Sequence, residues 1–405
     1  MRWFALPRAL RRSGRSGDGR FLADGSEHDA PEIREVTSRR DLDQFAKVPW
    51  RICADDPHWV PPLLVDVKEF LNRKRHPFYL HGAATQFLAL KNGTALGRIL
   101  VSDDPSYNRR HESNVGCFGM FECVDDRSTA QTLLDRAAAW LRARGRTSIM
   151  GPVDYSTNYN CGLLVEGFDT PPRIMMNHNP PYYAGLLESW GLAKAKDLYA
   201  WWFVDRFDLV AKWQRRTDWL ARRGGVTVRP FSKKDLPAEV DRCYQVYNSA
   251  QKEHWGFAEL TRAEFLYLAK RLAKIGLTDH ALMAEVQGKL VGFSVTLPDF
   301  NEAIRPLDGR LTTFGLPIGL VRLLYRLPRV KTARMAILVL LEAYRRRGIS
   351  ELLILETLNY GKDVVGYTGA ELSWTLEDND LINRTVEHVG GRRYKTYRIY
   401  EKSID

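Results

Sequence analysis

The chain has 405 residues, of which 44% are hydrophobic and 27% are charged, and its formal net charge is +11. This composition excludes a wholly disordered chain, and the length favours two domains. The excess of basic residues favours acidic partners, and nucleic acid, anionic lipid headgroups and the phosphates of a coenzyme all meet that description.

The cysteines and histidines argue against a disulfide framework and against a metal site. Five cysteines form no C-x-x-C pair, and their odd number leaves one unpaired. His76, His81 and His111 lack the spacing of metal ligands. We therefore expect no metal and a reducing, cytoplasmic location. No run of eighteen apolar residues occurs, so no transmembrane helix is predicted.

The first 33 residues differ in composition from the rest of the chain. Six arginines accompany a single acid, Asp18, within the first 20 residues, amid glycine and serine. This composition predicts a disordered basic tail over residues 1–33. In the alternative interpretation, its aromatic and leucine residues rest on an anionic membrane surface.

Residues 34–205 predict a first α/β domain. The dipeptide Asn92-Gly93 between two β-rich runs favours the tight turn of a hairpin. In chain order the expected elements are strands 86–90, 95–101 and 116–124, helix 129–144, strand 148–155, a helix ending at residue 191 and strand 196–203.

Residues 206–405 predict a second domain of similar plan. Thr261 and Glu264 form a capping box, and Gln287-Gly288 marks a second hairpin. The expected elements are helices 230–252 and 261–275, strands 280–286, 289–297 and 334–341, helix 350–364, strand 370–376, helix 380–389 and strand 393–401.

One stretch of each half matches the other closely. Asn179 to Tyr199 and Asn379 to Tyr400 both contain an asparagine, a helix, a glycine twelve residues on, and then a lysine and a tyrosine-rich strand. Duplication followed by divergence is the economical explanation. The chain is therefore expected to contain two tandem domains, each a mixed twisted sheet flanked by helices.

The segment from Leu311 to Leu327 is mostly apolar, but Arg322, Arg326 and three glycine or proline interruptions break it. Three interpretations remain open. The segment forms a helix packed in the core, it covers an acyl channel, or it lies in a membrane interface.

The heptapeptide from Tyr344 to Ser350 contains three arginines and a glycine between an expected strand and an expected helix. Such a turn aims backbone N–H groups and a helix N-terminus at one place, which suits a pyrophosphate. An ordinary basic turn is equally compatible with these residues. The corresponding turn of the first half contains Asp125-Asp126, whose charges would repel phosphate, so coenzyme binding is assigned to the second half.

The spacing Arg-x-x-Gly-x-Ser and the order of elements resemble the GNAT N-acyltransferase superfamily. The strings FYLHG, GPVDYSTN, NPPYY, SWTLEDN and YKTYRIYEK also resemble a bacterial family of tandem GNAT-like proteins, the ceramide synthase-like family. The resemblance implies transfer of an acyl group from an acyl-CoA or acyl carrier thioester to an amine, including a lipid or sphingoid-base amine. It implies acyl-CoA as co-substrate, no prosthetic group, and peripheral contact with the inner membrane.

The resemblance also implies positions for the coenzyme. Strand 337–341 would diverge from strand 370–376, and a backbone N–H near Val339 would polarise the thioester carbonyl. Asn379 would lie beside the pantetheine arm. Val386 stands where the family usually has a tyrosine that acts as the general acid for the departing thiolate. The residues expected at the pyrophosphate are Arg345, Arg346, Arg347, Gly348, Ile349 and Ser350.

Acylation needs a neutral amine, so a carboxylate is the expected general base. The candidates are Glu371, Glu377 and Asp299, with Asp378 as a further one. Each also suits a loop or helix cap. His254 is expected either to touch substrate or to pack in a turn. The rival class is a non-catalytic sensor or a nucleic-acid-binding regulator that retains the fold.

Overall fold

A computed structural model describes residues 30–204, 225–232, 234–252, 254–274 and 280–405 of the protein. Residues 31–405 form one compact unit. The predicted basic tail therefore lies almost entirely outside the described residues. Strand β1 (Glu32–Glu35) begins two residues before the expected start of the first domain, because it pairs antiparallel with β2.

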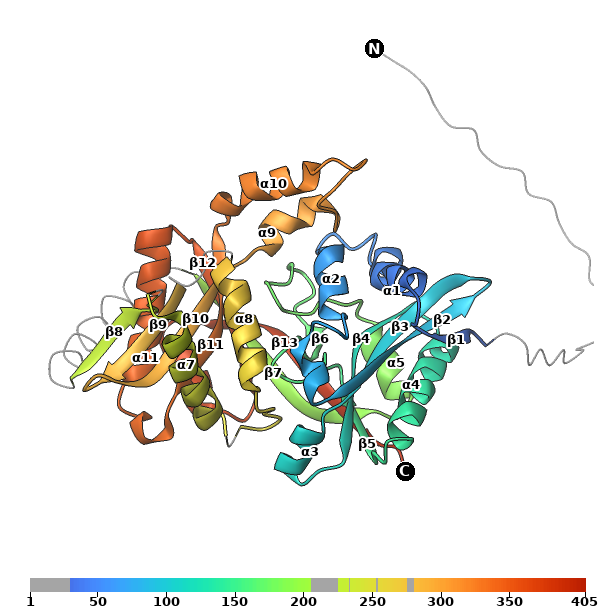
Figure 1. Ribbon diagram of the computed structural model, residues 1–405, viewed down its shortest axis with the longest axis horizontal. Helices are drawn as coiled ribbons and strands as arrows, with labels where there is room; N and C mark the ends of the chain where they lie inside the picture. Colours follow the sequence, from blue (N-terminus) through green and yellow to red (C-terminus); the bar gives the residue numbers. More distant parts are fainter. Residues whose placement is uncertain (1–29, 205–224, 233, 253, 275–279) are drawn as a thin grey trace, which may run out of the picture. The chain divides into compact units, whose positions relative to one another are not determined.

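The strands of this unit form one thirteen-stranded sheet (Figure 1), in the order β1-β2-β3-β4-β5-β13-β7-β12-β11-β10-β9-β8, with β6 pairing to β13. The bounds are β2 Ala83–Lys91, β3 Thr94–Asp103, β4 Val115–Cys123, β5 Ser148–Gly151, β6 Leu163–Glu166, β7 Ala193–Val204, β8 Val226–Pro230, β9 Ala281–Val286, β10 Lys289–Pro298, β11 Thr332–Leu340, β12 Gly369–Leu376 and β13 Arg392–Ser403.

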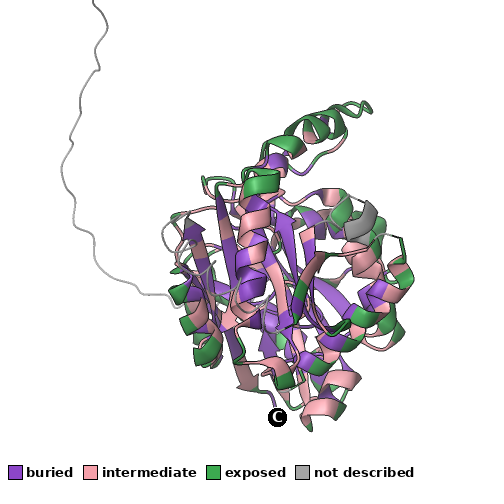
Figure 2. Cartoon of the chain, turned by 90° about the vertical axis from the view of Figure 1, so that its left-hand side faces the viewer, coloured by how far each residue is buried: buried purple, intermediate pink, exposed green. Residues whose placement is uncertain are grey.

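Helices cover this sheet, and in Figure 2 the strands are mostly buried whereas the helices carry exposed outer faces. Their bounds are α1 Arg39–Ile52, α2 Leu64–Phe70, α3 Pro105–His111, α4 Arg127–Arg142, α5 Tyr183–Ser189, α7 Leu236–Ala250, α8 Arg262–Lys274, α9 Asn301–Ile304, α10 Ile318–Arg326, α11 Ile349–Asn359 and α12 Asp380–His388. Short 3₁₀ turns η1 Pro77–Leu80, η3 Arg305–Leu307, η4 Leu327–Arg329 and η5 Glu342–Tyr344 and a π-helical turn Tyr360–Val365 complete the unit.

The local predictions are largely confirmed. Both hairpins form where they were expected, with Lys91 opposite Thr94 and Val286 opposite Lys289. The Thr261–Glu264 capping box is present, since each residue's backbone N–H donates to the other's side chain. Strand 148–155 is wrong in length: β5 ends at Gly151, because the following Pro152 has no N–H to donate to a ladder.

The two expected domains are present, and their last strands are exchanged. Strand β13, at the end of the second half, pairs with β5 of the first half. Strand β7, at the end of the first half, pairs with β12 of the second half, and β7 and β13 also pair with each other. The two halves therefore share one continuous sheet and are not joined by a linker alone.

Tyr397 in β13 tests this joint. Its side chain is fully buried in a cluster with Met150 of β5 and Leu198 of β7. Tyr397→Ala is expected to lower the free energy of unfolding by about 3–5 kcal/mol. Tyr397→Phe is the control and should stay within about 1 kcal/mol of the wild type, because the buried hydroxyl bonds to none of the described residues. Urea unfolding measures both, and equal stability of the two variants would contradict the role of β13.

The apolar segment 311–327 does not pack into the core as a helix. Its helix α10 has Leu320, Val321 and Leu324 exposed by 41%, 62% and 59%, so the core-packing interpretation is wrong. In the part of the chain that the structure describes, no helix combines the length and apolarity that crossing a membrane requires.

Candidate active site

The site begins where two neighbouring strands separate. Strands β11 and β12 pair in parallel from Thr332 opposite Gly369 to Met335 opposite Leu372, and there the ladder ends. Beyond this point β11 continues along β10 and β12 continues along β7. The divergence leaves a wedge in the sheet at Ala336 and Ser373, the first residues after the last pair.

A cavity of about 1290 Å³ opens from this wedge. Its walls come from the wedge residues 335–338 and 372–376, from helices α7 and α8, and from the first-half segments 157–163 and 174–179. Most of the lining side chains are apolar, among them Phe257, Phe265 and Phe293. The cavity is therefore a large, mainly apolar space with a few polar groups at the wedge.

A buried polar cluster stands at the tip of the wedge. The Nε of Arg334 donates to the Oγ of Ser373 at 2.8 Å, and this Oγ donates to Oε1 of Glu371 at 2.5 Å. Arg334 Nε lies 3.4 Å from the same Oε1, and the hydroxyl of Tyr394 donates to Oε2. Burial lowers the pKa of Arg334 and raises that of Tyr394, which keeps the phenol protonated.

This cluster reaches the cavity through two of its members. Arg334 and Ser373 line the cavity, while the fully buried Glu371 lies behind them. Of the three predicted carboxylates, Glu371 is thus linked to the cavity through one hydroxyl.

The other two predicted carboxylates are held by protein groups. Asp299 accepts from Arg173 at 3.0 Å and from the backbone N–H of Ile174 at 2.9 Å. Burial raises its pKa to about 6 against the opposing effect of the Arg173 guanidinium. Glu377 accepts from Lys194 at 2.7 Å and from the N–H of Asp197 at 3.1 Å. Both carboxylates tie second-half strand ends to the first half, and neither lines the cavity.

Among the amides near Val339, the register with β10 decides which one faces the wedge. Leu341 donates its N–H to Val291 of β10 at 2.9 Å, and the register along β10 is unbroken from residue 337 to 340. Because N–H directions alternate along a strand, the N–H of Val339 also faces β10. The N–H of Leu338 faces the wedge instead, and Leu338 lines the cavity.

The basic turn has the geometry of an anion cradle. Arg346 and Gly348 have φ values of 60° and 81°, and α11 starts at the next residue, the buried Ile349. No described residue accepts from the backbone N–H of any residue from 346 to 351. The turn therefore presents a row of free N–H groups at a helix N-terminus.

The three arginines of this turn differ in role. Arg346 and Arg347 are exposed and add positive charge beside the free N–H groups. Arg345 is half-buried and donates through Nη2 to the carbonyl of Ala250 at 2.6 Å, which fastens the turn to the end of α7. Ser350 is half-buried in the first turn of α11.

Asn379 and Val386 stand on the other side of the wedge and both line the cavity. Asn379 caps α12, accepting from the N–H of Ile382 at 3.4 Å. Asp378 is bound to Lys196 at 2.7 Å. His254 lines the cavity, and burial together with the charge of Arg345 lowers its pKa, so its imidazole is neutral at pH 7.

At the corresponding place in the first half, the chain bonds back across the separated strands, and Met120 and Asp154 line the cavity there. Strands β4 and β5 pair only from Val115 to Cys117, but the chain after β5 then bonds back to β4. Val153 donates to the carbonyl of Phe118 at 2.6 Å, and Asp154 accepts from the N–H of Met120 at 2.8 Å. Asp126 caps α4 through the N–H of Thr129. Backbone and a carboxylate thus bridge the strands at the place that the second half leaves open.

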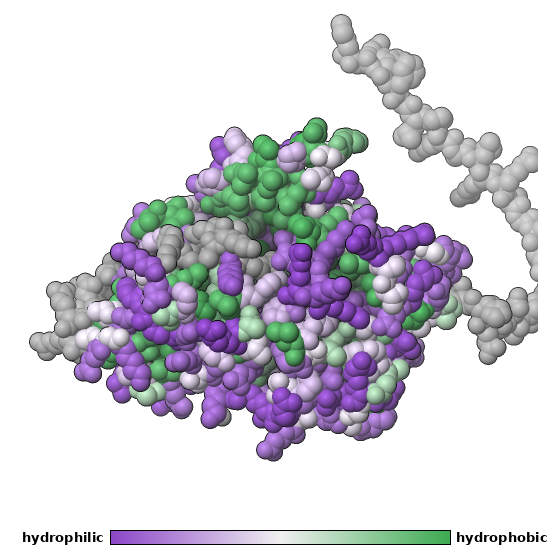
Figure 3. All heavy atoms as spheres, viewed as in Figure 1, coloured by the Kyte–Doolittle hydropathy of each residue, from purple (hydrophilic) through white to green (hydrophobic). Residues whose placement is uncertain are grey.

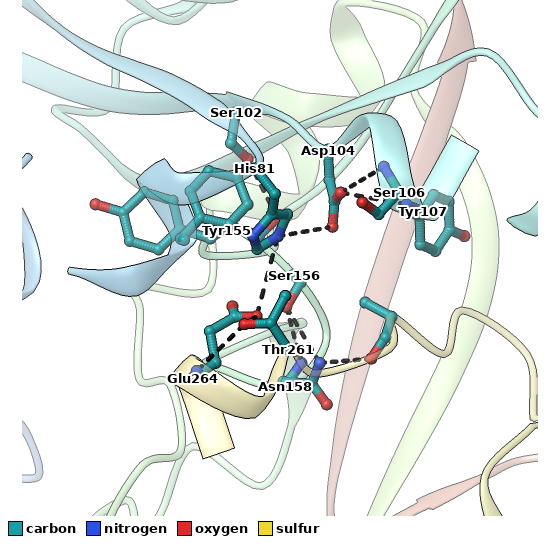
Figure 4. A network of polar contacts seen from close by, with 12 residues as sticks. His81, Ser102, Asp104, Ser106, Tyr107, Tyr155, Ser156, Asn158, Thr261 and Glu264 are labelled. Carbon is teal, nitrogen blue, oxygen red and sulfur yellow. Dashed lines mark hydrogen bonds and ion pairs between the residues drawn. The ribbon is translucent and has the colours of Figure 1, made fainter. Parts of the chain in front are cut away.

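A polar network joins the walls of the cavity (Figure 4). His81 Nε2 lies 3.9 Å from Asp104 and 4.0 Å from Glu264, the residue that completes the capping box of α8. Asn158 donates to the carbonyl of Ala258 at 2.7 Å. These contacts hold second-half segments against the first half. No group of three or more histidine, cysteine or acidic side chains in the described ranges is arranged to hold a metal.

Sequence reasoning missed the pair His178 and Asp56. The imidazole Nε2 lies 2.7 Å from the carboxylate of Asp56, and burial lowers the pKa of His178 against the opposing effect of that hydrogen bond. His178 lines the cavity with only 2% of its side chain exposed. The one feature of the sequence that could have drawn attention to His178 is its place in the string NHNPP. No local feature links His178 to Asp56, which lies 122 residues away.

Lys395 was also missed. Its side chain is 1% exposed, and Nζ donates to the carbonyls of Gly167 and Thr170. Burial lowers its pKa to about 8. Lys395 therefore anchors the segment that leads into the cavity wall at residue 174.

Relatives with similar sequences cover nearly the whole chain. A bacterial ceramide synthase from Caulobacter vibrioides is 36% identical over 380 residues, which cover 91% of this chain and 96% of the relative. Protein YghO from Escherichia coli is 34% identical over 377 residues, covering 92% and 95%. No family model matches the chain.

Solved structures resemble the fold over the same length. A tandem GNAT protein from the clavulanic acid biosynthesis pathway has a TM-score of 0.55 and 14% identity, and the match covers 92% of this chain and 98% of that one. A GCN5-related N-acetyltransferase from Sphaerobacter thermophilus has a TM-score of 0.53 and 13% identity, covering 93% and 96%. These findings confirm the expected fold and favour an enzyme over a non-catalytic sensor or regulator. The chain belongs to the family of the bacterial ceramide synthase, and it has the fold of the tandem GNAT proteins.

Proposed function

We propose that the protein transfers an acyl group from a thioester, acyl-CoA or an acyl carrier, to an amine. The observation that carries this proposal is the end of the β11–β12 ladder at Met335 and Leu372, from which the large cavity opens. A pantetheine arm fits between the separated strands, and its thioester carbonyl then lies beside the N–H of Leu338, which stabilises the negative charge of the tetrahedral intermediate.

The proposed coenzyme contacts follow from the same geometry. The free N–H groups from Arg346 to Glu351 bind the pyrophosphate, and the exposed Arg346 and Arg347 supply its counter-charge. Arg345 positions the turn through its bond to Ala250. Asn379, which follows β12 on the other side of the wedge, lies beside the pantetheine arm.

The proton path runs through Ser373 to Glu371. The amine nitrogen attacks the thioester carbon, the C–N bond forms and the C–S bond breaks. Ser373 Oγ takes the amine proton as it passes its own to Glu371, 2.5 Å away. Glu371 then returns the proton through Ser373 to the sulfur, which departs as a thiol and leaves the carboxylate ionised again. We assign structural roles to Asp299 and Glu377, because their oxygens accept hydrogen bonds from protein donors.

The proposed acceptor is a lipid amine of the sphingoid-base class. The relative named ceramide synthase motivates this choice, and the mainly apolar cavity of about 1290 Å³ supports it, because two alkyl chains need such a volume. We place the protein in the bacterial cytoplasm, at the inner membrane where such lipids reside.

We also propose that the boundary between the two duplicated domains lies at residues 205–206, just after β7 ends at Val204. With this boundary, each domain contributes its last strand to the other's side of the sheet. The exchange ties the two walls of the cavity together.

The experiment is acyl transfer by the purified protein from acyl-CoAs of two to eighteen carbons, about the range that distinguishes soluble from lipid chemistry, to a sphingoid base or a water-soluble amine. Mass spectrometry detects the amide. We expect long-chain transfer to the sphingoid base. Efficient acetyl transfer to the soluble amine without long-chain turnover contradicts the lipid acceptor, and no transfer at all contradicts the proposed function.

A further inference from the structure

The segment around α10 exposes an unusual amount of apolar surface. Figure 3 shows it as a hydrophobic cap over α10. We call these side chains the α10 face: Phe314, Leu316, Ile318, Leu320, Val321, Leu324 and Tyr325, each exposed by between 38% (Ile318) and 98% (Phe314). Single exposed apolar residues are ordinary, but a contiguous set of this size marks an interaction surface.

The helix separates this outer face from an inner one. At about 100° per residue, Leu320, Val321, Leu324 and Tyr325 point to one side of α10. Leu323, which lies about 60° from Leu320 on the helix, and Leu327, just past the end of α10, line the cavity together with Leu311. Gly319 is buried, and the helix rests there so closely on the preceding chain that an added Cβ would lie 2.0 Å from the carbonyl oxygen of Arg310. One thin element therefore separates the cavity from the outer apolar face.

The charge around this face has one sign. Every charged residue from 309 to 331 is basic. The five cations are Arg310, Arg322, Arg326, Arg329 and Lys331, and all are exposed. Two of them, Arg322 and Arg326, follow one edge of α10, one turn apart. An apolar face bordered by arginines is the pattern of a helix that lies in the interface of an anionic bilayer.

We propose that the α10 face docks on an anionic phospholipid bilayer and that the amine lipid enters the cavity from the bilayer, past Leu323 and Leu327. The entry route rests on the proposed function, whereas the docking itself does not. The helix lies along the interface, with Phe314 and Leu324 among the acyl chains and the arginines at the headgroup phosphates.

A second copy of this chain is a poorer occupant of the same face. In a symmetric dimer the α10 faces would meet each other, which would bring five cations of one copy against five of the other. An anionic bilayer instead supplies the opposite charge to all of them.

The test uses a matched pair of substitutions in the full-length protein. Val321 on the α10 face and Val364 in the π-helical turn Tyr360–Val365 are exposed by 62% and 68%. Val321→Glu should weaken binding to vesicles of phosphatidylcholine and phosphatidylglycerol at least about tenfold, because it places a charge in the apolar layer. Val364→Glu should leave binding unchanged. Co-sedimentation with the vesicles measures both.

The arginines are tested separately. The double variant Arg322→Gln and Arg326→Gln should weaken binding to the anionic vesicles by about thirtyfold and reduce the preference over pure phosphatidylcholine by the same factor. Failure of the wild type to bind anionic vesicles overturns the proposal, as do equal losses for Val321→Glu and Val364→Glu. A dimer that dissociates in Val321→Glu, without vesicle binding, assigns the face to a second copy and also overturns it.

The entry route has its own measurement. Acyl transfer to a sphingoid base embedded in vesicles should fall at least about tenfold more in Val321→Glu than transfer to a detergent-dispersed acceptor. Equal loss on both acceptors contradicts the route. Absence of transfer by the wild type on either acceptor is instead a failure of the proposed acyltransfer, and it leaves the vesicle-binding result standing on its own.

Discussion

Glu371→Gln is expected to lower the rate of acyl transfer by about 10²–10⁴-fold, with acyl-CoA binding retained. Glutamine keeps the size of the side chain, but its single carbonyl oxygen replaces only one of the two oxygens that accept from Ser373 and Tyr394, and it cannot take up the proton that the amine releases. The substitution also leaves the buried Arg334 without its counter-charge, which costs about 3–5 kcal/mol of unfolding free energy. Rates are therefore normalised to the folded fraction measured by circular dichroism.

Asp299→Asn is the matched control for this stability loss. Asp299 is also buried and also paired with an arginine, Arg173, but it does not line the cavity. We expect a similar destabilisation, and a transfer rate per folded molecule within about threefold of the wild type, because no proton passes through this pair. A rate in Glu371→Gln above one tenth of the wild type, or a larger loss in Asp299→Asn, contradicts the assignment of Glu371.

Gly348→Glu is expected to weaken coenzyme A binding by more than about a hundredfold. Gly348 has a φ of 81°, which costs an L-residue about 1–2 kcal/mol. The new carboxylate would also stand beside the pyrophosphate, where like charges about 4 Å apart repel by about 4 kcal/mol at the dielectric of a protein surface. Isothermal titration with coenzyme A measures the affinity.

Gly366→Glu separates backbone strain from charge. Its φ of 83° nearly equals that of Gly348, and an added Cβ would meet no atom within 4 Å. Both variants should lose similar thermal stability, while only Gly348→Glu loses the coenzyme. Equal coenzyme affinity in the two variants would show that the basic turn is an ordinary strand-to-helix connection.

The local elements of this fold were predictable because their signals are local. The dipeptides Asn92-Gly93 and Gln287-Gly288, the Thr261–Glu264 capping box and the turn from Tyr344 to Ser350 all act within a few residues. The fold and the family followed from the order of these elements. Coenzyme positions beyond the turn came from resemblance, which pointed to the neighbourhood of Val339 and not to a single amide.

The sequence could not choose among the amides near Val339, because the direction of an N–H depends on the register with β10, which a sequence does not display. Glu371, Glu377 and Asp299 were equivalent as acids in the sequence, and packing made them different. Two acquired donors from the first half, at Arg173 and Lys194, while Glu371 acquired a hydroxyl that faces the cavity. His178 and Asp56 could not be paired from the sequence, because only the packing of the folded chain brings these two distant residues together.

The sequence by itself determined the two α/β halves, the basic turn in the second half and the acidic one in the first, because periodicity, turn residues and charge are properties of short segments. Only the tertiary structure decided that β7 and β13 are exchanged, that Val153 and Asp154 bond back to β4 in the first half, and that α10 lies between the cavity and solvent. Each of these depends on contacts between segments at least 34 residues apart, and that choice is made by packing over the whole sheet.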